Sequence, residues 1–217
     1  LRRLEYRGYD SAGMAVLNGA GDLQRLRTTG KVAELARAID RQPLRGVAGI
    51  AHTRWATHGR PSESNAHPHI CRNRVAVVHN GIIENFRDLR AELAEHGVSF
   101  STDTDTETVA LLTQYHMDQG DDPVTAANKT LDRLQGAFAL AFLFSGQDDL
   151  MIAARKGSPL AIGHGNGEMF VGSDAIALAP LTDRITYLEE GDRAVITRAG
   201  VEIVDAEGRR ANRAIKT

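Results

Sequence analysis

Short apolar runs separated by glycine and polar turns recur along this chain and predict β-strands. Two such runs, at 12–18 and 23–28, are joined by four turn residues, which is typical of a hairpin. Residues 49–55 and 75–78 predict two further strands. The run at 75–78 is wholly apolar, so we expect a buried strand that ends at 79–81, where the sequence reads His-Asn-Gly.

Helical spacing of apolar residues appears between these runs. It predicts helices over 31–39, 85–96, 106–117 and 123–134, and Gly97 is placed to end the second of them. That second helix carries its apolar residues on one face, at Phe86, Leu89, Leu93 and Ala94.

The second half of the chain consists mainly of apolar runs without strict alternation, which predicts strands covered on both faces. Helices grouped between strand-rich stretches indicate an α+β protein with several sheets. Residues 206–217 are polar and rich in arginine, which is typical of the start of a linker. The predicted strands of this half are 137–144, 150–154, 160–162, 170–173, 193–197 and 201–205.

Composition adds limits to this picture. A chain of 217 residues fits one domain or two small ones, and a net charge of −2 gives no general attraction to nucleic acid or anionic membrane. No apolar stretch is long enough to span a membrane. The single cysteine excludes an intrachain disulfide and fits the reducing, cytoplasmic compartment.

Three polar blocks lie at the ends of predicted strands, where binding and catalytic groups tend to be found. Residues 52–59 read His-Thr-Arg-Trp-Ala-Thr-His-Gly, residues 65–69 read Asn-Ala-His-Pro-His, and residues 79–85 read His-Asn-Gly-Ile-Ile-Glu-Asn. With the opening segment 4–13 and the Thr-Asp-Thr-Glu sequence at 104–107, these blocks resemble the glutaminase domain of glutamine–fructose-6-phosphate aminotransferases.

The resemblance implies a fold. Members of that family are four-layer αββα sandwiches of two stacked, mainly antiparallel sheets, the N-terminal-nucleophile hydrolase fold. Residues 1–205 would then form the glutaminase domain and residues 206–217 would lead toward a sugar-isomerase module. Family members begin with a nucleophilic cysteine on a leading strand, whereas this sequence begins at Leu1, so we expect that first strand to be missing.

Arg54 follows an apolar run and precedes a tryptophan. A guanidinium matches a carboxylate with two parallel hydrogen bonds, although an ordinary ion pair with Asp or Glu is the simpler structural explanation. The resemblance assigns Arg54 to the α-carboxylate of glutamine, with Thr57 and His58 holding the same end of the ligand. Trp55 would lie in a loop that closes over it, or simply pack in the core.

Asn80-Gly81 is a common tight-turn dipeptide, which would explain it as a hairpin. An amide side chain and a glycine backbone N–H can also converge on one point as two hydrogen-bond donors. The resemblance assigns Asn80 and Gly81 to an oxyanion hole.

Asp105 precedes a predicted helix, where an N-terminal cap is the usual role for an aspartate. The resemblance instead makes Asp105 the partner of the substrate α-ammonium. It also places Arg7, before the helix-ending Gly8, beside the nucleophile that it would position.

The histidine-rich blocks raise the question of a metal site. No pair of histidines shows the short helical spacing of a zinc site, so we expect no metal, and His67 and His69 are expected to build loop structure. Cys71 lies in an expected turn and lacks a free α-amine to act as its base, so we interpret it as incidental.

The resemblance implies that the complete enzyme hydrolyses glutamine without a cofactor and supplies ammonia for conversion of fructose 6-phosphate to glucosamine 6-phosphate. Its partners would be glutamine or glutamate, the sugar-isomerase module and a second copy in a homodimer. Three alternatives stay open: a catalytically dead glutamine-binding fragment, the glutaminase domain of another class II amidotransferase, and a metal-dependent hydrolase built on the histidines.

Overall fold

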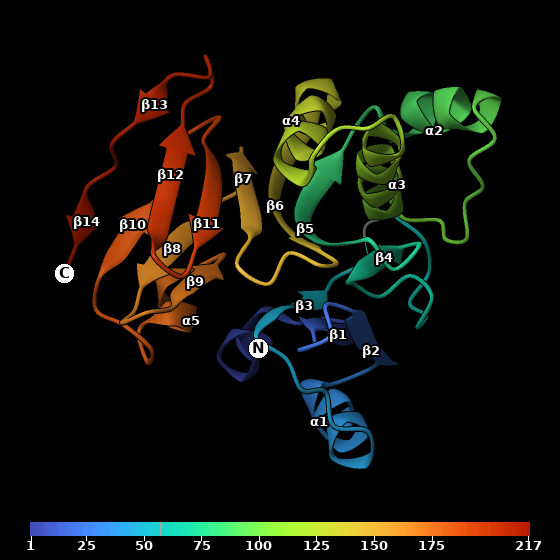
Figure 1. Ribbon diagram of the computed structural model, residues 1–217. Coiled ribbons are helices and arrows are strands. Elements are labelled where there is room, and N and C mark those ends of the chain that lie inside the picture. The colour runs from blue at the N-terminus through green and yellow to red at the C-terminus, as the bar shows by residue number, and fades with distance from the viewer. Residues whose placement is uncertain (57) are drawn as a thin grey trace.

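The computed structural model describes residues 1–56 and 58–217, with the side chains of residues 6 and 7 left aside. Helices and strands follow one another in mixed order along the chain (Figure 1). The helices are η1 (Arg2–Arg7), α1 (Val32–Arg41), α2 (Phe86–Glu95), α3 (Asp105–Asp118), α4 (Pro123–Arg133) and α5 (Ala175–Leu178). The strands are β1 (Ser11–Leu17), β2 (Leu23–Thr29), β3 (Ala48–Arg54), β4 (His69–Cys71), β5 (Val75–Ile83), β6 (Gly136–Phe144), β7 (Met151–Lys156), β8 (Ala161–His164), β9 (Met169–Gly172), β10 (Ile185–Tyr187), β11 (Arg193–Thr197), β12 (Gly200–Val204), β13 (Arg210–Ala211) and β14 (Ile215–Lys216).

A seven-stranded sheet, in the order β13-β12-β11-β7-β6-β5-β4, forms the central layer of the molecule. Its strand β6 is buried on both faces. Successive side chains of a strand point to opposite faces. The large side chains at 138, 140, 142 and 144 pack into the core beneath α2, α3 and α4. The alternate residues Ala139, Ala141 and Leu143 face the second layer of strands.

The second layer consists of two separate sheets, β2-β1-β3 and β14-β10-β8-β9. The sheet β2-β1-β3 packs against the central sheet through Ala15, Leu17 and Ile50. Leu160 and Ile162, in and beside the sheet β14-β10-β8-β9, do the same. Helix α1 covers the outer face of β1 through Val32 and Leu35, on the opposite side of the molecule from α3 (Figure 1). All strand pairs are antiparallel. The predicted α+β sandwich with αββα layering is confirmed.

The predicted end of the strand at 75–78 is wrong. Strand β5 continues through Asn80 and Gly81 to Ile83, and Ile83 is paired with Gly136 at the start of β6. The long apolar run of β6 supplies a partner over this whole length, and Gly81 takes a positive φ of 121°, which residues with a side chain rarely adopt. The chain segment that was expected to be a loop is therefore held rigidly in the sheet.

Several short elements lack a recognisable sequence signal. Strands β4 and β10 contain three residues each, and α5 contains four. Within 206–217, for which a linker was expected, β13 pairs with β12 and β14 pairs with β10.

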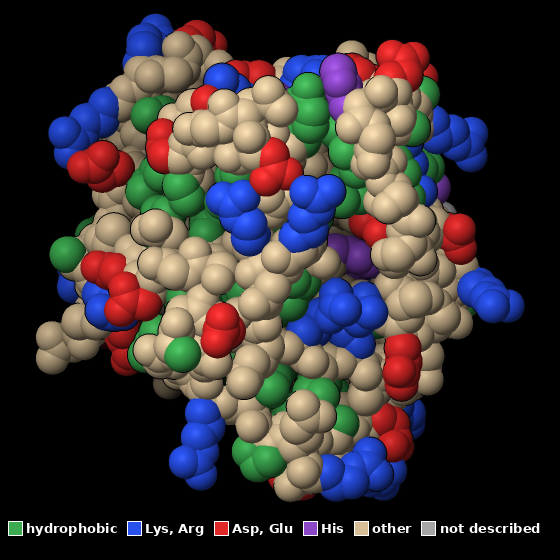
Figure 2. All heavy atoms as spheres, turned by 45° about the vertical axis from the view of Figure 1, so that its right-hand side comes forward, with side chains coloured by type: hydrophobic (Ala, Val, Ile, Leu, Met, Phe, Trp, Pro, Cys, Tyr) green, Lys and Arg blue, Asp and Glu red, His purple; other side chains and the backbone are tan. Residues whose placement is uncertain are grey.

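The face in Figure 2 carries interspersed blue and red side chains without a field of a single charge, in keeping with the small net charge. Among the described residues, no helix is both long and apolar enough to cross a membrane.

Candidate functional site

A cavity of about 830 Å³ lies between the central sheet and the second layer. Two strand edges contribute to its wall, β3 from the sheet β2-β1-β3 and β9 from the sheet β14-β10-β8-β9, and each is the last strand of its sheet. Polar groups enter from the end of β5 and the start of α3. The predicted site residues that line the cavity are Arg54, Trp55, His58, Asn80, Gly81 and Asp105.

Strand β3 aims Arg54 inward. Ile50 packs against the central sheet, and the period of two then places His52 and Arg54 on the same face. Arg54 is only 4% exposed. Its Nη2 donates to the backbone oxygens of His58 and Gly59, the latter at 3.1 Å, so the guanidinium holds the loop after β3 in place.

The second arm of the same guanidinium is not satisfied by hydrogen bonds. Nη1 of Arg54 lies 3.6 Å from Oδ1 of Asp10, and this buried atom has no hydrogen-bond partner in the described part of the chain. Burial lowers the pKa of Arg54, while the carboxylates of Asp10 and Asp105 oppose that shift. The ion pair with Asp10 is the ordinary Asp or Glu partner that the sequence allowed, and the hydrogen bond that Nη1 still lacks makes it a candidate for binding an anionic group.

Asp105 is the first residue of α3, and the alternative that it caps this helix is wrong. The cap is Thr104, whose Oγ1 accepts the N–H of Glu107 at 3.3 Å. The Asp105 carboxylate accepts the N–H of Ile83 at 2.9 Å and that of Thr106 at 3.0 Å. Oδ2 of Asp105 also lies 3.7 Å from Nδ1 of His79, so the carboxylate ties α3 to the end of β5.

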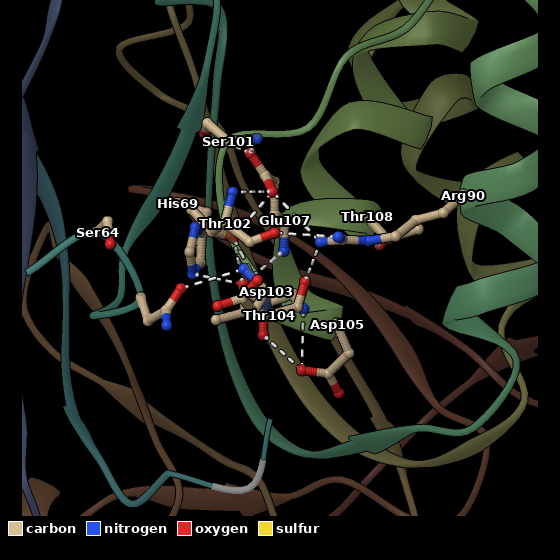
Figure 3. Close-up of polar contacts among 12 residues, drawn as sticks. Ser64, His69, Arg90, Ser101, Thr102, Asp103, Thr104, Asp105, Glu107 and Thr108 are labelled. Carbon is tan, nitrogen blue, oxygen red and sulfur yellow. Dashed lines mark hydrogen bonds and ion pairs between the residues drawn. The ribbon is translucent and has the colours of Figure 1, made fainter. Parts of the chain in front are cut away.

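The segment that leads to Asp105 is organised around Glu107 (Figure 3). The Glu107 carboxylate accepts the backbone N–H and hydroxyl groups of both Ser101 and Thr102, at 2.6–2.8 Å. Arg90 reaches the same point from α2 and donates to the backbone oxygens of Thr102 and Thr104 at 3.0 and 2.7 Å. These bonds fix the chain directly before Asp105.

Asn80 and Gly81 lie on β5 opposite β6. The side chain of Asn80 has the same strand parity as Ala76, which packs toward the second layer, so it faces the cavity. Gly81 cannot be replaced by another residue without strain, because a Cβ there would lie 2.1 Å from the backbone oxygen of Ala137. Gly81 lines the cavity, and a glycine backbone can approach a ligand closely.

Trp55 is 67% exposed at the edge of the cavity, and its ring lies against the position where Gly8 would carry a Cβ. His58 packs edge-on against the Phe86 ring, with centroids 5.0 Å apart. Gly8 ends η1 at a φ of 72°, as its sequence context predicts. Thr57 and the side chain of Arg7, both predicted site residues, lie outside the described residues.

A cluster of histidine rings forms part of the cavity wall, which His52, His67 and His79 line. His67 stacks on His52 with centroids 4.3 Å apart and contacts His69 at 5.1 Å. Burial lowers the pKa of His52 and of His79 to about 4 in each case, and it lowers the pKa values of His67 and His69 well below the usual range. These rings are therefore neutral at pH 7. No group of His, Cys, Asp and Glu within the described ranges has a geometry that could hold a metal ion.

Cys71 is buried at the end of β4 rather than in the expected turn, and it packs in the core beneath the helices. Burial raises the pKa of its thiol to about 11. A thiol of this kind is a poor nucleophile at neutral pH, in keeping with its interpretation as incidental.

Sequence reasoning missed three residues that shape the site. His52 bonds to Asn80, with its Nε2 atom 2.7 Å from Oδ1. Asp10 faces Arg54, and Asn65 joins two loops by accepting the N–H of Asp103 and donating to the backbone oxygen of Arg60. The position of His52 two residues before Arg54 on a predicted strand was a usable signal, whereas the other two contacts depend on loop paths.

Known proteins share this chain's sequence over most of its length. A family model described as a glutamine amidotransferase domain matches residues 52–180. A glutamine–fructose-6-phosphate aminotransferase (isomerizing) of Bradyrhizobium diazoefficiens is 62% identical over 208 residues, which are 96% of this chain and 34% of that protein. Its counterpart in Brucella abortus is 58% identical over 216 residues, 100% of this chain and 35% of that protein. The chain thus spans about a third of the length of these curated relatives.

Solved structures share the fold. The glutamine phosphoribosylpyrophosphate amidotransferase from B. subtilis, complexed with ADP and GMP, matches with a TM-score of 0.80 at 25% identity, over 94% of this chain and 45% of that one. A glutamine aminotransferase class-II domain protein from Silicibacter pomeroyi matches with a TM-score of 0.62 at 18% identity, over 90% of each chain. The predicted N-terminal-nucleophile hydrolase fold is confirmed by these likenesses.

Proposed function

This chain belongs to the glutamine amidotransferase domain family, and from that premise we propose that its cavity binds glutamine for hydrolysis to glutamate and ammonia. The enzyme that contains it would use the ammonia to convert fructose 6-phosphate to glucosamine 6-phosphate, as the names of its curated relatives indicate for the aminotransferase activity.

This proposal rests on two buried side chains of opposite charge at one cavity. Arg54 offers an unused Nη1 donor, and Asp105 offers a carboxylate. A free amino acid carries the complementary α-carboxylate and α-ammonium groups. Arg54 would clamp the carboxylate and Asp105 would hold the ammonium, with Trp55, Thr57 and His58 around them. A compound that lacks one of these two charged groups would leave Arg54 or Asp105 unpaired and would bind weakly.

The chemistry would take place at the side-chain amide. A thiolate attacks the amide carbon and negative charge develops on the oxygen. The Asn80 side chain and the Gly81 N–H would stabilise that charge as an oxyanion hole. Ammonia leaves after protonation, and water then releases glutamate from the thioester.

The thiolate would come from a cysteine with a free α-amine, which serves as its base, on a leading strand beside Arg7. Cys71 does not line the cavity, and its raised pKa opposes the role. The unpaired edges of β3 and β9 at the same cavity offer hydrogen-bonding partners for such a strand. Without that cysteine the chain would bind glutamine and leave it intact, which is the second candidate function.

We further propose that residues 1–205 act as the glutaminase domain and that 206–217 lead toward a sugar-isomerase module in a cytoplasmic homodimer. Support for the module comes from the length of the curated relatives, of which this chain spans about a third.

Calorimetric titration of this chain tests the proposal. We expect L-glutamine to bind, and we expect at least about a tenfold loss of affinity for 4-aminobutanamide, which lacks the α-carboxylate, and for 2-oxoglutaramate, which lacks the α-ammonium. Arg54→Ala should weaken glutamine binding at least as much, while Arg37→Ala, an exposed residue of α1, serves as the control. Equal affinities for the three compounds would refute the recognition of a zwitterion.

A further inference from the structure

His52 forms the contact between the two strand layers at the oxyanion site. It lies on β3 of the second layer, while Asn80 lies on β5 of the central sheet. The Nε2 atom of His52 is 2.7 Å from Oδ1 of Asn80, a strong hydrogen-bond distance. The Asn80 carboxamide is therefore held by a residue of the other strand layer.

The protonation state of His52 determines the direction of this bond. Burial lowers the pKa of His52 to about 4, so the neutral ring carries a single N–H at pH 7. Its Nδ1 atom is buried and forms no well-directed hydrogen bond among the described residues, although a backbone contact with His79 opposes the fall in the pKa of the ring. A proton on Nδ1 would leave a buried donor unpaired, which is rarer and costlier than an unpaired acceptor. The proton therefore belongs on Nε2, where it is donated to Asn80.

The direction of the bond in turn orients the carboxamide. Its oxygen accepts from His52, so its NH₂ group must point away from that ring. Within the described part of the chain, the Nδ2 atom of Asn80 donates no hydrogen bond, and the residue lines the cavity. In the flipped orientation the NH₂ group would face the N–H of His52, and the carboxamide oxygen would meet a developing oxyanion.

We propose that His52 is a positioning residue for hydrolysis, whose Nε2–H selects the orientation of Asn80 that presents an N–H donor to the substrate oxygen. This inference rests on the proposed function and extends it, because it assigns the fixed geometry of the oxyanion hole to a residue that acts through Asn80. Preorganised donors stabilise a transition state without reorientation during the reaction.

Steady-state glutaminase kinetics of the complete enzyme, with its cysteine nucleophile, test the role. For His52→Leu we expect kcat to fall by about 10- to 100-fold with the KM for glutamine within about twofold, since a misdirected donor affects the transition state more than binding. His52→Gln should recover most of the lost rate, because its side-chain amide can donate from near the position of Nε2. A His52→Gln enzyme as slow as His52→Leu, or a rise in KM that accounts for the loss, would overturn the role.

A double-mutant cycle separates positioning from general damage to the fold. Asn80→Ala alone should lower kcat by about 100- to 1000-fold. Adding His52→Leu to Asn80→Ala should slow the enzyme little further, because the orienting bond is already gone. The same rate factor for His52→Leu in both backgrounds would overturn the inference.

These results also separate the inference from the function beneath it. A normal rate for Asn80→Ala would contradict the proposed role of Asn80 in the oxyanion hole. A slow Asn80→Ala enzyme together with a normal His52→Leu enzyme would overturn only the positioning role. Nitrogen-15 NMR of the His52 ring gives an independent answer: a proton on Nε2 supports the inference, and a proton on Nδ1 contradicts it.

Discussion

At the scale of single residues, Gly81 shows most clearly how backbone conformation and packing together restrict the residue type. It combines a φ of 121° with a Cβ position 2.1 Å from the backbone oxygen of Ala137 on β6. Gly97 has a φ of 78° but no neighbouring heavy atom within 4 Å of its Cβ position. The two glycines share an unusual backbone conformation and differ in available space.

This difference makes a matched pair of variants informative. Gly97→Ala should lower the free energy of unfolding by about 1–2 kcal/mol, the cost of the backbone conformation alone. Gly81→Ala should cost several kcal/mol, because backbone atoms of β5 or β6 must also move. Chemical denaturation of both variants measures the difference. Equal losses would show that the close approach to Ala137 carries no energetic weight.

Arg54 stood out in the sequence as an arginine at the end of an apolar strand, and the family resemblance assigned its role in the site. Its partner Asp10 and its backbone contacts at His58 and Gly59 were not, since they depend on how the loop after β3 folds back. The residues that line the cavity could thus be predicted, whereas the network that holds them could not.

At the scale of elements, the long apolar strands and the helices with an apolar face were predictable, because burial imposes a regular period on their sequences. The three-residue strands β4 and β10 were not, since so few residues show no period and the pairing depends on distant partners. The same limit explains the wrong end of β5: its last residues are strand because β6 lies opposite them.

The start of α3 depends on the Glu107 carboxylate, which accepts several hydrogen bonds. Glu107 accepts four hydrogen bonds from Ser101 and Thr102 and lies 3.3 Å from Nη2 of Arg90. Glu107→Gln replaces one accepting oxygen with an NH₂ group that faces other donors. We expect the free energy of unfolding to fall by about 2–3 kcal/mol and the KM for glutamine to rise, because the segment before Asp105 loosens.

The control for this change is Glu95→Gln at the exposed end of α2, which should alter the free energy of unfolding by less than about 0.5 kcal/mol. Denaturation curves and steady-state kinetics supply the two quantities. An unchanged KM in a clearly destabilised Glu107→Gln enzyme would show that the segment does not set the position of Asp105.

At the scale of the whole molecule, the buried neutral histidines couple stability to pH. The folded-state pKa values of His52 and His79 are about 4 in each case, whereas an unfolded histidine titrates near 6.5. Between these values the unfolded chain binds more protons than the folded one, so stability falls as the pH is lowered. Each of the two residues should cost about 2 kcal/mol between pH 7 and pH 5.

Thermal denaturation of this chain across that range measures the effect. His67→Gln should flatten the decline, because burial also lowers the pKa of His67, while Arg37→Ala, at an exposed residue of α1, should leave the slope unchanged. A midpoint that stays constant from pH 7 to pH 5 would show that the histidine cluster is already accessible to protons in the folded state.

The central claim is that one cavity between two strand layers recognises both charges of an amino acid. A crystal structure of this chain with bound L-glutamate tests it most directly. We expect the α-carboxylate on Nη1 of Arg54, the α-ammonium on the carboxylate of Asp105, and the side-chain carboxylate toward Asn80 and Gly81. Glutamate bound with its α-carboxylate and α-ammonium away from Arg54 and Asp105 would contradict the account.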